Sequence, residues 1–246
     1  MKKLAKVFAL VVLMIMGGQA MAQTHGYMAL GASFPMSEFG DGTTFTNTAL
    51  GGNYDDGGAG IGFNAGLKWY FGVGVKGLNV LLSVDGFYNG PSGDMKDYYK
   101  KMRSDMEAWC DNVSVTSPKY INVPAMLGLN YSYDINNQLG IFAEAGIGGN
   151  MRFITDYNVK GTSKILGLKN TSTYDYENAF TLAWQAGVGV EVSKSLVISC
   201  SIYDLGKAPV KGELTSIVEG VGAPTVDFEY GDAHPFMLVG RIGFKF

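Results

Sequence analysis

The sequence contains few of the side chains that most often build metal sites, disulfide frameworks and catalytic centres. It has two cysteines, Cys110 and Cys200, and two histidines, His25 and His234, in 246 residues. Two cysteines do not make a disulfide framework, and these four residues lie too far apart in sequence to predict a metal site. We expect Cys110 in an external loop and Cys200 within a strand as a small buried hydrophobe, so no pairing is expected. The sequence therefore predicts neither a metal nor a cofactor.

Long apolar runs and basic charge are also scarce. The apolar run VFALVVLMIM (7–16) follows three lysines and precedes the small-residue motif AMA (20–22). This pattern predicts a secretory signal peptide, residues 1–22, and the run is too short to span a bilayer as a helix. Without the three signal lysines, 16 basic side chains remain against 22 acidic ones, which argues against nucleic acid as a partner. We expect residues 23–246 to form one domain.

Alternation of apolar with polar or small residues is the main pattern of this mature chain. It predicts eight strands, at 25–35, 58–71, 78–89, 118–133, 139–154, 178–192, 196–206 and 235–246. The connections after the second, fourth and sixth strands are short, whereas the others are long. Short turns at one end and long loops at the other are typical of outer-membrane barrels. The sequence thus predicts an all-β, eight-stranded antiparallel transmembrane barrel with short periplasmic turns and long extracellular loops.

Each strand that we compared has one wholly non-polar face. The sixth strand, for example, sets Phe180, Leu182 and Trp184 on one face against Gln185 and Glu191 on the other. In lipid, no sheet edge can be left unpaired, so strands of this kind must close into a barrel. A soluble β-sandwich or lipocalin-like barrel is the alternative, but soluble strands are usually shorter.

Aromatic residues and one proline add local expectations. Aromatic girdles are predicted near the strand ends, from Trp69, Tyr70, Phe71, Tyr131 and Tyr133 on the short-turn side and from Phe87, Tyr88, Tyr120 and Phe153 on the other. Pro124 lies on an inward face and lacks a ladder donor, so we expect a bulge near Asn122 to Pro124.

A glycine motif also requires an interpretation. The spacing Gly72-x-Gly74-x-x-Gly77 matches the dinucleotide-binding fingerprint, which needs a strand before it and a helix after it. Strand patterns flank the motif on both sides. We therefore expect a periplasmic hairpin turn whose glycines serve positions with positive φ.

Ionised residues on the inward faces are the first candidate site. They are Lys68, Asp85, Glu144, Arg152, Glu191, Arg241 and Lys245. An eight-stranded barrel encloses little more than its own side chains. Because the charges are opposite and nearly balanced, we expect an ion-pair network that plugs the lumen. A narrow charged pore for small solutes is the alternative.

The second long loop is the other candidate site. The stretch DMKDYYKKMRSDMEAWC (94–110) spaces its apolar residues at helical intervals, and Asp94 suits an N-cap. The stripe includes Tyr98, Tyr99, Met102, Met106 and Trp109. Such a helix could lie across the barrel mouth as a lid, rest in the lipid interface, or bind an extracellular protein or glycan.

Catalysis is the competing class of function. Asp232-x-His234 is similar to the Asp–His dyad of outer-membrane aspartyl proteases, and Asp55-Asp56 could supply further carboxylates. The match is only two residues long, and even positions in the last strand are predicted to face outward. We therefore expect no enzyme, with an outer-membrane hydrolase as a distant alternative. The first loop, with Asp41, also lacks the spacing of an EF-hand.

Two segments carry a family resemblance. YINVPAMLGLNY (120–131) resembles the tyrosine–apolar–x–apolar–proline strand of the small outer-membrane β-barrel family of Bacteroidota that is called PorT-like. The final RIGFKF, with Phe244 and Phe246, is similar to the C-terminal signal that the barrel-assembly machinery reads. The resemblance implies an integral outer-membrane protein of eight strands and says little about activity. We expect a monomer in outer-membrane lipid of a Gram-negative cell, with a structural or surface-interaction role.

Overall fold

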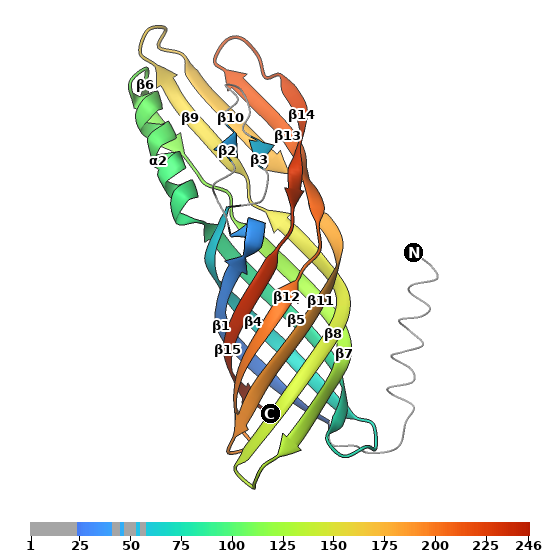
Figure 1. Cartoon of the computed structure of the whole chain (residues 1–246). Coiled ribbons are helices and arrows are strands. Elements are labelled where there is room, and N and C mark those ends of the chain that lie inside the picture. The colour runs from blue at the N-terminus through green and yellow to red at the C-terminus, as the bar shows by residue number, and fades with distance from the viewer. Residues whose placement is uncertain (1–23, 41–44, 47–52, 55–57) are drawn as a thin grey trace, which may run out of the picture.

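Eight long strands form a closed barrel in the computed structural model, which describes residues 24–40, 45–46, 53–54 and 58–246. The predicted signal peptide and the loop residues Asp41, Asp55 and Asp56 lie outside these residues. The barrel strands are β1 (Thr24–Met36), β4 (Ala59–Gly72), β5 (Leu78–Pro91), β7 (Tyr120–Asp134), β8 (Leu139–Ile154), β11 (Ala179–Val192), β12 (Leu196–Asp204) and β15 (Phe236–Lys245). Every neighbouring pair is antiparallel, and β1 pairs with both β4 and β15, so the wall is closed (Figure 1). The predicted barrel is confirmed.

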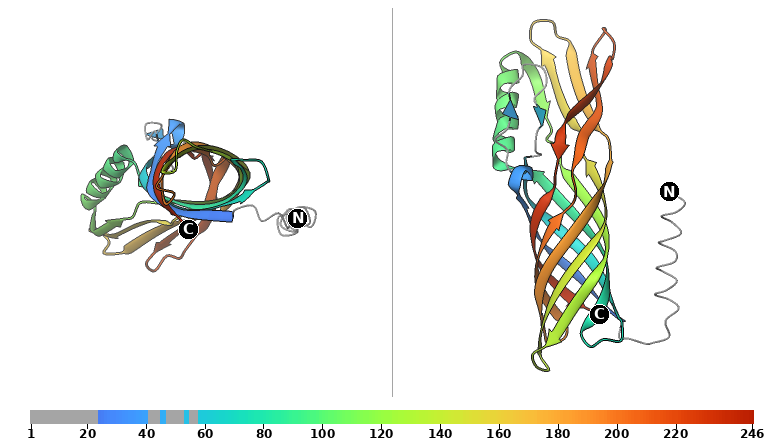
Figure 2. Two further views of the ribbon diagram at one scale, coloured as in Figure 1. Left: turned by 90° about the horizontal axis from the view of Figure 1, so that it is seen from below. Right: turned by 45° about the vertical axis from the view of Figure 1, so that its right-hand side comes forward.

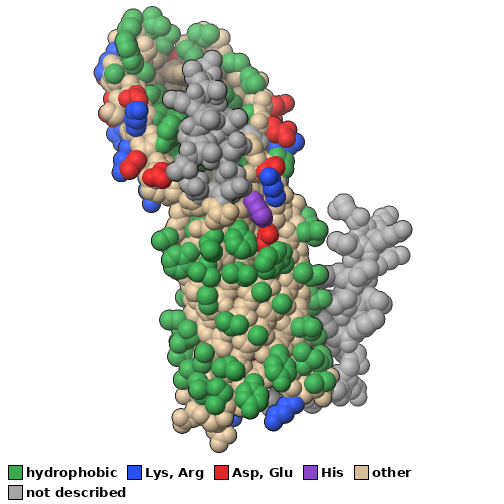
Figure 3. Space-filling model, viewed as in Figure 1, with side chains coloured by type: hydrophobic (Ala, Val, Ile, Leu, Met, Phe, Trp, Pro, Cys, Tyr) green, Lys and Arg blue, Asp and Glu red, His purple; other side chains and the backbone are tan. Residues whose placement is uncertain are grey.

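The outer face of the barrel is an apolar belt. Outward side chains such as Ile61, Ile147 and Leu182 are 71%, 72% and 83% exposed. Hydrophobic side chains are spread over the visible barrel wall, whereas charged ones gather above it (Figure 3). A belt of this size would be unfavourable in water and is covered by a bilayer. Because every barrel strand is hydrogen-bonded on both sides, the wall also leaves no sheet edge in lipid.

Three tight turns join the barrel strands at one end, as expected. The glycine motif forms the first, between β4 and β5, where Gly74 and Gly77 have φ of +80° and +81°. Strands flank it on both sides, with Phe71 opposite Val80, so it has no helix N-terminus for a phosphate. In the last turn, Ser193 and Lys194 both have positive φ, which matches the right-handed twist of a hairpin.

The sequence predicts long loops for the other connections, but in the structure these connections contain strands. Beyond the barrel they form a five-stranded sheet of β6 (Cys110–Val115), β9 (Tyr157–Ser163), β10 (Lys169–Tyr176), β13 (Ala208–Val218) and β14 (Thr225–Ala233). After two or three residues, β8, β11, β12 and β15 each pass into a strand of this outer sheet, in the same lateral order. The outer sheet therefore extends one side of the barrel wall (Figures 1 and 2). The sequence signal for it was the enrichment in Thr, Tyr and Val, which favours strands.

The α-helix α2 (Gly93–Glu107) covers the outer sheet next to β6. Its N-cap is Ser92, whose hydroxyl accepts the backbone N–H of Met95, and not the predicted Asp94. At the other end, the Lys164 ammonium donates to the carbonyls of Glu107 and Ala108, as cations commonly do at helix C-termini. The helix stands beside the barrel axis and not across the mouth, so its position is not that of the lid, one of the three alternatives (Figure 2).

The other described elements are short. They are a 3-10 turn, η1 (Ser37–Phe39), and a small hairpin of β2 (Phe45–Thr46) and β3 (Asn53–Tyr54). No helix in the described part of the chain is long and apolar enough to cross a membrane.

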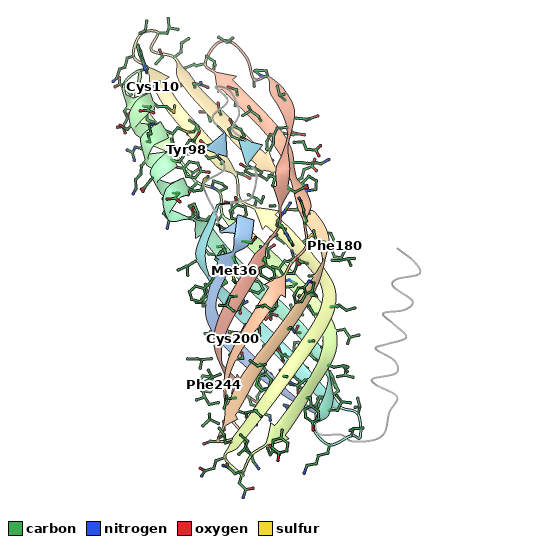
Figure 4. All side chains as sticks on the ribbon, viewed as in Figure 1. Met36, Tyr98, Cys110, Phe180, Cys200 and Phe244 are labelled. Carbon is green, nitrogen blue, oxygen red and sulfur yellow. The ribbon has the colours of Figure 1, made fainter. Side chains whose placement is uncertain are left out.

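Several local expectations from the sequence are wrong. The β7–β8 register runs through Pro124 without a shift, so there is no bulge. On the β5 side, the ladder omits the two pairs at Pro124 and Val123 and resumes in the same register at Phe87–Asn122. Cys200 is exposed on the outer face rather than buried (Figure 4), and both cysteines are unpaired. Finally, three predicted girdle residues point inward and are buried: Tyr70, Phe87 and Tyr120.

Close strand contacts make one glycine position a test of the barrel wall. A Cβ on Gly128 would lie 2.0 Å from the Ala145 carbonyl oxygen, whereas a Cβ on Gly240 would meet no atom within 4 Å. We expect Gly128→Ala to lower the free energy of unfolding by about 1–3 kcal/mol, because backbone must move to admit the methyl group. Gly240→Ala should leave it nearly unchanged. Urea unfolding in lipid vesicles measures both, and equal effects would contradict this packing.

Candidate functional site

Lys68 and Glu144 form a buried ion pair in the barrel lumen. Lys68 comes from β4 and Glu144 from β8, so the pair spans the lumen between distant parts of the wall. Their side chains are 1% and 0% exposed. The Tyr70 hydroxyl donates to the second carboxylate oxygen of Glu144 at 2.9 Å. All three residues occupy even, inward positions of strands whose odd positions face outward, which is why strand alternation brings them together.

Arg241 and Asp85 form a second buried pair. An Arg241 Nη2 lies 3.1 Å from Asp85 Oδ1, and both side chains are almost fully buried. The guanidinium also donates from Nε to Asn64 Oδ1 at 2.6 Å, and the Tyr203 hydroxyl donates to Asp85 Oδ2 at 3.1 Å. The Arg241 guanidinium lies 5.0 Å from the centre of the Tyr203 ring. The two ion pairs leave no net charge, as a low-dielectric lumen requires.

Arg152 differs from the expected ion-pair network, because its side-chain hydrogen bonds go to carbonyl groups. It donates to Ala233 O and Pro209 O at 2.9 Å each, and to Ala208 O at 3.2 Å. These carbonyls belong to the ends of β13 and β14 that lie next to the barrel. Arg152 therefore fixes these segments over the outer end of the lumen. The surrounding side chains are an apolar cluster that includes Phe39, Phe87, Tyr120, Tyr157, Leu205 and Met237.

The last predicted pair, Glu191 and Lys245, lies at the short-turn end of the lumen. Lys245 Nζ is 2.7 Å from Glu191 Oε1, and both side chains are a little over one-fifth exposed. With His25, Tyr27 and Asn130, among others, they line a cavity of ≈ 20 Å³. That is room for about one water molecule. Buried polar and charged side chains thus occupy the lumen at several levels, from Arg152 to this mouth.

The predicted stripe of α2 packs mainly on the outer sheet. The rings of Tyr99 and Tyr157 have centroids 5.4 Å apart, and the Tyr157 hydroxyl donates to the Met102 sulfur at 2.8 Å. The row of rings continues from Tyr157 to Tyr174 at 5.0 Å and on to Phe228 at 5.8 Å. The stripe therefore packs against the outer sheet, which the sequence does not predict.

Tyr98 and Tyr174 lie outside the membrane-spanning strands, and the pKa of each hydroxyl is raised. Burial raises the pKa of the Tyr174 hydroxyl, and burial together with the nearby Tyr174 raises the pKa of Tyr98. Both hydroxyls therefore stay neutral over a wider pH range than free tyrosine.

Part of the stripe stays open. Tyr98, Met102, Met106 and Trp109 line a cleft of ≈ 540 Å³ together with Lys101, Asp105 and Cys110. Trp109 lies beyond the end of α2 and is 71% exposed. The last turn of the stripe is thus the part that solvent reaches.

The suggested catalytic dyad does not form. Asp232 pairs with Lys207 at 3.2 Å, whereas the His234 Nε2 lies 2.8 Å from Asp204 Oδ1. Asp204 also accepts the indole N–H of Trp184 at 3.2 Å. These contacts hold the junction between barrel and outer sheet. Within the described residues, no group of three or more His, Cys, Asp or Glu could hold a metal ion.

The C-terminal residues lie on the outer face of the closing strand. Phe244 and Phe246 are 64% and 68% exposed, and Phe246 exchanges backbone hydrogen bonds with Gly26 of β1. Both rings are therefore accessible from the surroundings of the barrel, and their role as an assembly signal stays a prediction.

The neutral partners of the lumen charges are not predicted from the sequence. The sequence predicts Tyr70 in an aromatic girdle, although its even position, like that of Lys68, already indicates the inward face. Tyr203 and Asn64 complete the Asp85–Arg241 group. Alternation indicated that these side chains face inward, but not which charge each one meets.

No protein-family model matches the chain, and no curated protein sequence matches it. Among solved structures, the chain is similar to the outer membrane protein OprG of Pseudomonas aeruginosa, with 13% identity, a TM-score of 0.47, and coverage of 92% of this chain and 96% of that one. It is also similar to Ail, the attachment invasion locus protein of Yersinia pestis, with 12% identity, a TM-score of 0.38, and coverage of 90% and 98%. Neisserial surface protein A follows with 11% identity, a TM-score of 0.36, and coverage of 91% and 96%. The fold described above rests on the strand pairing of the chain itself.

The buried Lys68–Glu144 pair gives a sharp stability test. Lys68→Ala should lower the free energy of unfolding by about 3–5 kcal/mol, because it leaves the Glu144 carboxylate buried without its cation. The triple change Lys68→Met, Tyr70→Phe and Glu144→Leu removes all three polar partners and should cost much less. Urea titration of the refolded barrel in vesicles gives both values. If the triple variant lost as much as the single one, the pair would not be a desolvated ion pair.

Proposed function

We propose that this chain is an integral outer-membrane barrel with a closed lumen, which acts at the cell surface through its outer sheet and α2. The observation that carries the proposal is the filled lumen, where two buried ion pairs lie below an apolar cluster that Arg152 helps to fix. Surface interaction is the role that this arrangement favours, because one side of the wall extends beyond the barrel as an ordered sheet. We do not expect catalysis, since the suggested dyad is occupied by other partners.

The proposal includes export and membrane insertion. A signal peptide of residues 1–22 would direct the chain through the inner membrane, and residues 23–246 would insert as a monomer into outer-membrane lipid. Phe244 and Phe246 would be read by the barrel-assembly machinery. The resemblance of residues 120–131 to the PorT-like family is consistent with this route.

A narrow porin is the second candidate, because the lumen is polar and lined by charges of both signs. Conduction would require the Lys68–Glu144 and Arg241–Asp85 pairs to separate, and each separation leaves ionised groups buried in a medium of low dielectric. The proposal therefore favours a closed lumen as the resting state.

Single-channel recording tests the proposal directly. Refolded residues 23–246, with insertion verified by heat-modifiable gel mobility, should give no steady conductance in a planar bilayer. The physical reason is that two buried ion pairs cross the lumen and the cavity at its short-turn mouth holds about one water molecule. Reproducible steps that change in size in Glu144→Ala or Arg152→Ala would make the protein a narrow porin instead.

Removal of the outer sheet tests whether the barrel strands alone are sufficient for membrane insertion. We expect a variant in which short turns replace 93–115, 157–176 and 210–232 to insert and to keep its heat-modifiable mobility, because the closed wall lies entirely in the barrel strands and the carbonyl partners of Arg152 are retained. Gel mobility and protease resistance in vesicles measure this. Failure of the trimmed barrel to insert would show that the outer sheet serves assembly rather than display.

A further inference from the structure

The farthest end of the outer sheet from the barrel carries a cluster of exposed apolar side chains, which we call the distal crown. It consists of Trp109, Ile165, Leu166 and Val221, which are 71%, 81%, 70% and 76% exposed. These values match those of the lipid-facing side chains of the barrel belt, which reach 83% at Leu182. Yet the crown lies at the opposite end of the molecule from the short turns (Figure 1).

Three separate chain segments meet in the distal crown. Ile165 and Leu166 lie in the turn between β9 and β10, and Val221 lies in the turn between β13 and β14. The two turns are neighbours, since the backbone N–H of Glu219 donates to Lys169 O at 3.0 Å. Trp109 joins them because its carbonyl accepts the backbone N–H of Lys164 at 3.1 Å. The crown is therefore built by the outer sheet and not by one flexible loop.

The charged groups of these turns are directed back onto the sheet. Lys164 Nζ donates to the last carbonyls of α2, and a Glu219 carboxylate oxygen accepts the backbone N–H of Lys169 at 3.4 Å. The turn backbones also bend back sharply, with φ of +69° at Gly167 and +121° at Gly222. The aliphatic side chains are left as the protruding groups of both turns.

We propose that the distal crown inserts into an apposed lipid bilayer, which rests on the proposed function of the outer sheet as an interaction surface. Ile165, Leu166 and Val221 protrude from turns, and Trp109 borders the cleft beside α2. A fluid bilayer accepts a protruding apolar group without a complementary pocket. Tryptophan favours the bilayer interface, and lysine side chains can place their charge at the headgroups. The Lys164 ammonium is offset by Asp111, whose Oδ1 lies 4.0 Å from Lys164 Nζ, so zwitterionic lipid is sufficient and no anionic lipid is required.

The membrane that holds the barrel does not reach the crown. Two ion pairs lie between the belt and the crown. Lys207, just before β13, pairs with Asp232 of β14, and Lys211 of β13 pairs with Glu229 of β14. Ion pairs of this exposed kind belong in water. Charged side chains separate the two apolar regions on the visible face of the molecule (Figure 3). The bilayer that the crown would enter is therefore a second one, opposite the first.

Fluorescence quenching tests the proposal. The chain has three tryptophans, so Trp69→Phe with Trp184→Phe leaves Trp109 as the only reporter. This variant is placed in nanodiscs and mixed with phosphatidylcholine vesicles whose acyl chains are brominated. We expect quenching and a blue shift of Trp109. The control Trp69→Phe with Trp109→Phe keeps only Trp184 in the belt, and its quenching reports any exchange of lipid into the nanodisc.

A crown variant and a matched surface variant then assign the contact. Ile165→Ser, Leu166→Ser and Val221→Ser together should weaken vesicle binding by about tenfold for each side chain that enters the bilayer. The control set Lys160→Ser, Glu213→Ser and Asp227→Ser places serine at three other exposed sites of the outer sheet and should bind as the parent does.

Several outcomes would overturn the proposal. These are absence of Trp109 quenching, quenching that requires anionic vesicles, and unchanged binding by the crown variant. Crown-dependent self-association of nanodiscs in sedimentation would identify a second copy of the chain as the partner instead. Planar-bilayer conductance is measured independently. Absence of conductance together with absence of crown-dependent vesicle binding would therefore remove only the crown proposal.

Discussion

Closure of the hydrogen-bonded wall is the constraint on which the rest of the structure depends. A bilayer offers no water to an unpaired N–H or carbonyl group, so the ladder must end where it began. The chain meets this requirement when β15 pairs with β1, and Phe246 extends the contact to Gly26. Once the wall is closed, strand alternation directs every second residue either to lipid or to the lumen. Charge is then admitted on one face only.

The lumen follows from that restriction. Eight strands enclose too little space for bulk water, so an ionised side chain there must find its counter-charge among the other inward residues. Lys68 meets Glu144 and Arg241 meets Asp85, with tyrosine hydroxyls on both carboxylates. Arg152 lies higher, where strands leave the barrel, and backbone carbonyls replace the carboxylate. One barrel thus uses two ways to hold a buried cation.

Outside the membrane the constraint is released, and the wall no longer has to close. There the chain forms an open sheet of five strands whose edges water can solvate. That sheet needs only one covered face, and α2 supplies the cover through Tyr99 and Met102 against Tyr157. The turns at its far end expose Ile165, Leu166 and Val221 to solvent, so these side chains do not pack in the core.

The sequence by itself determined the barrel, because alternation of period two repeats over all eight strands and their bounds agree with the structure within a few residues. It also determined which charges face inward, as for Lys68 and Glu144, and that residues 94–107 are helical. Only the tertiary structure decided that Arg152 binds carbonyls, that Tyr70 serves Glu144, and that α2 packs on a sheet. The physical reason is that alternation sets the face of a residue, whereas its partners depend on register and closure between strands distant in sequence.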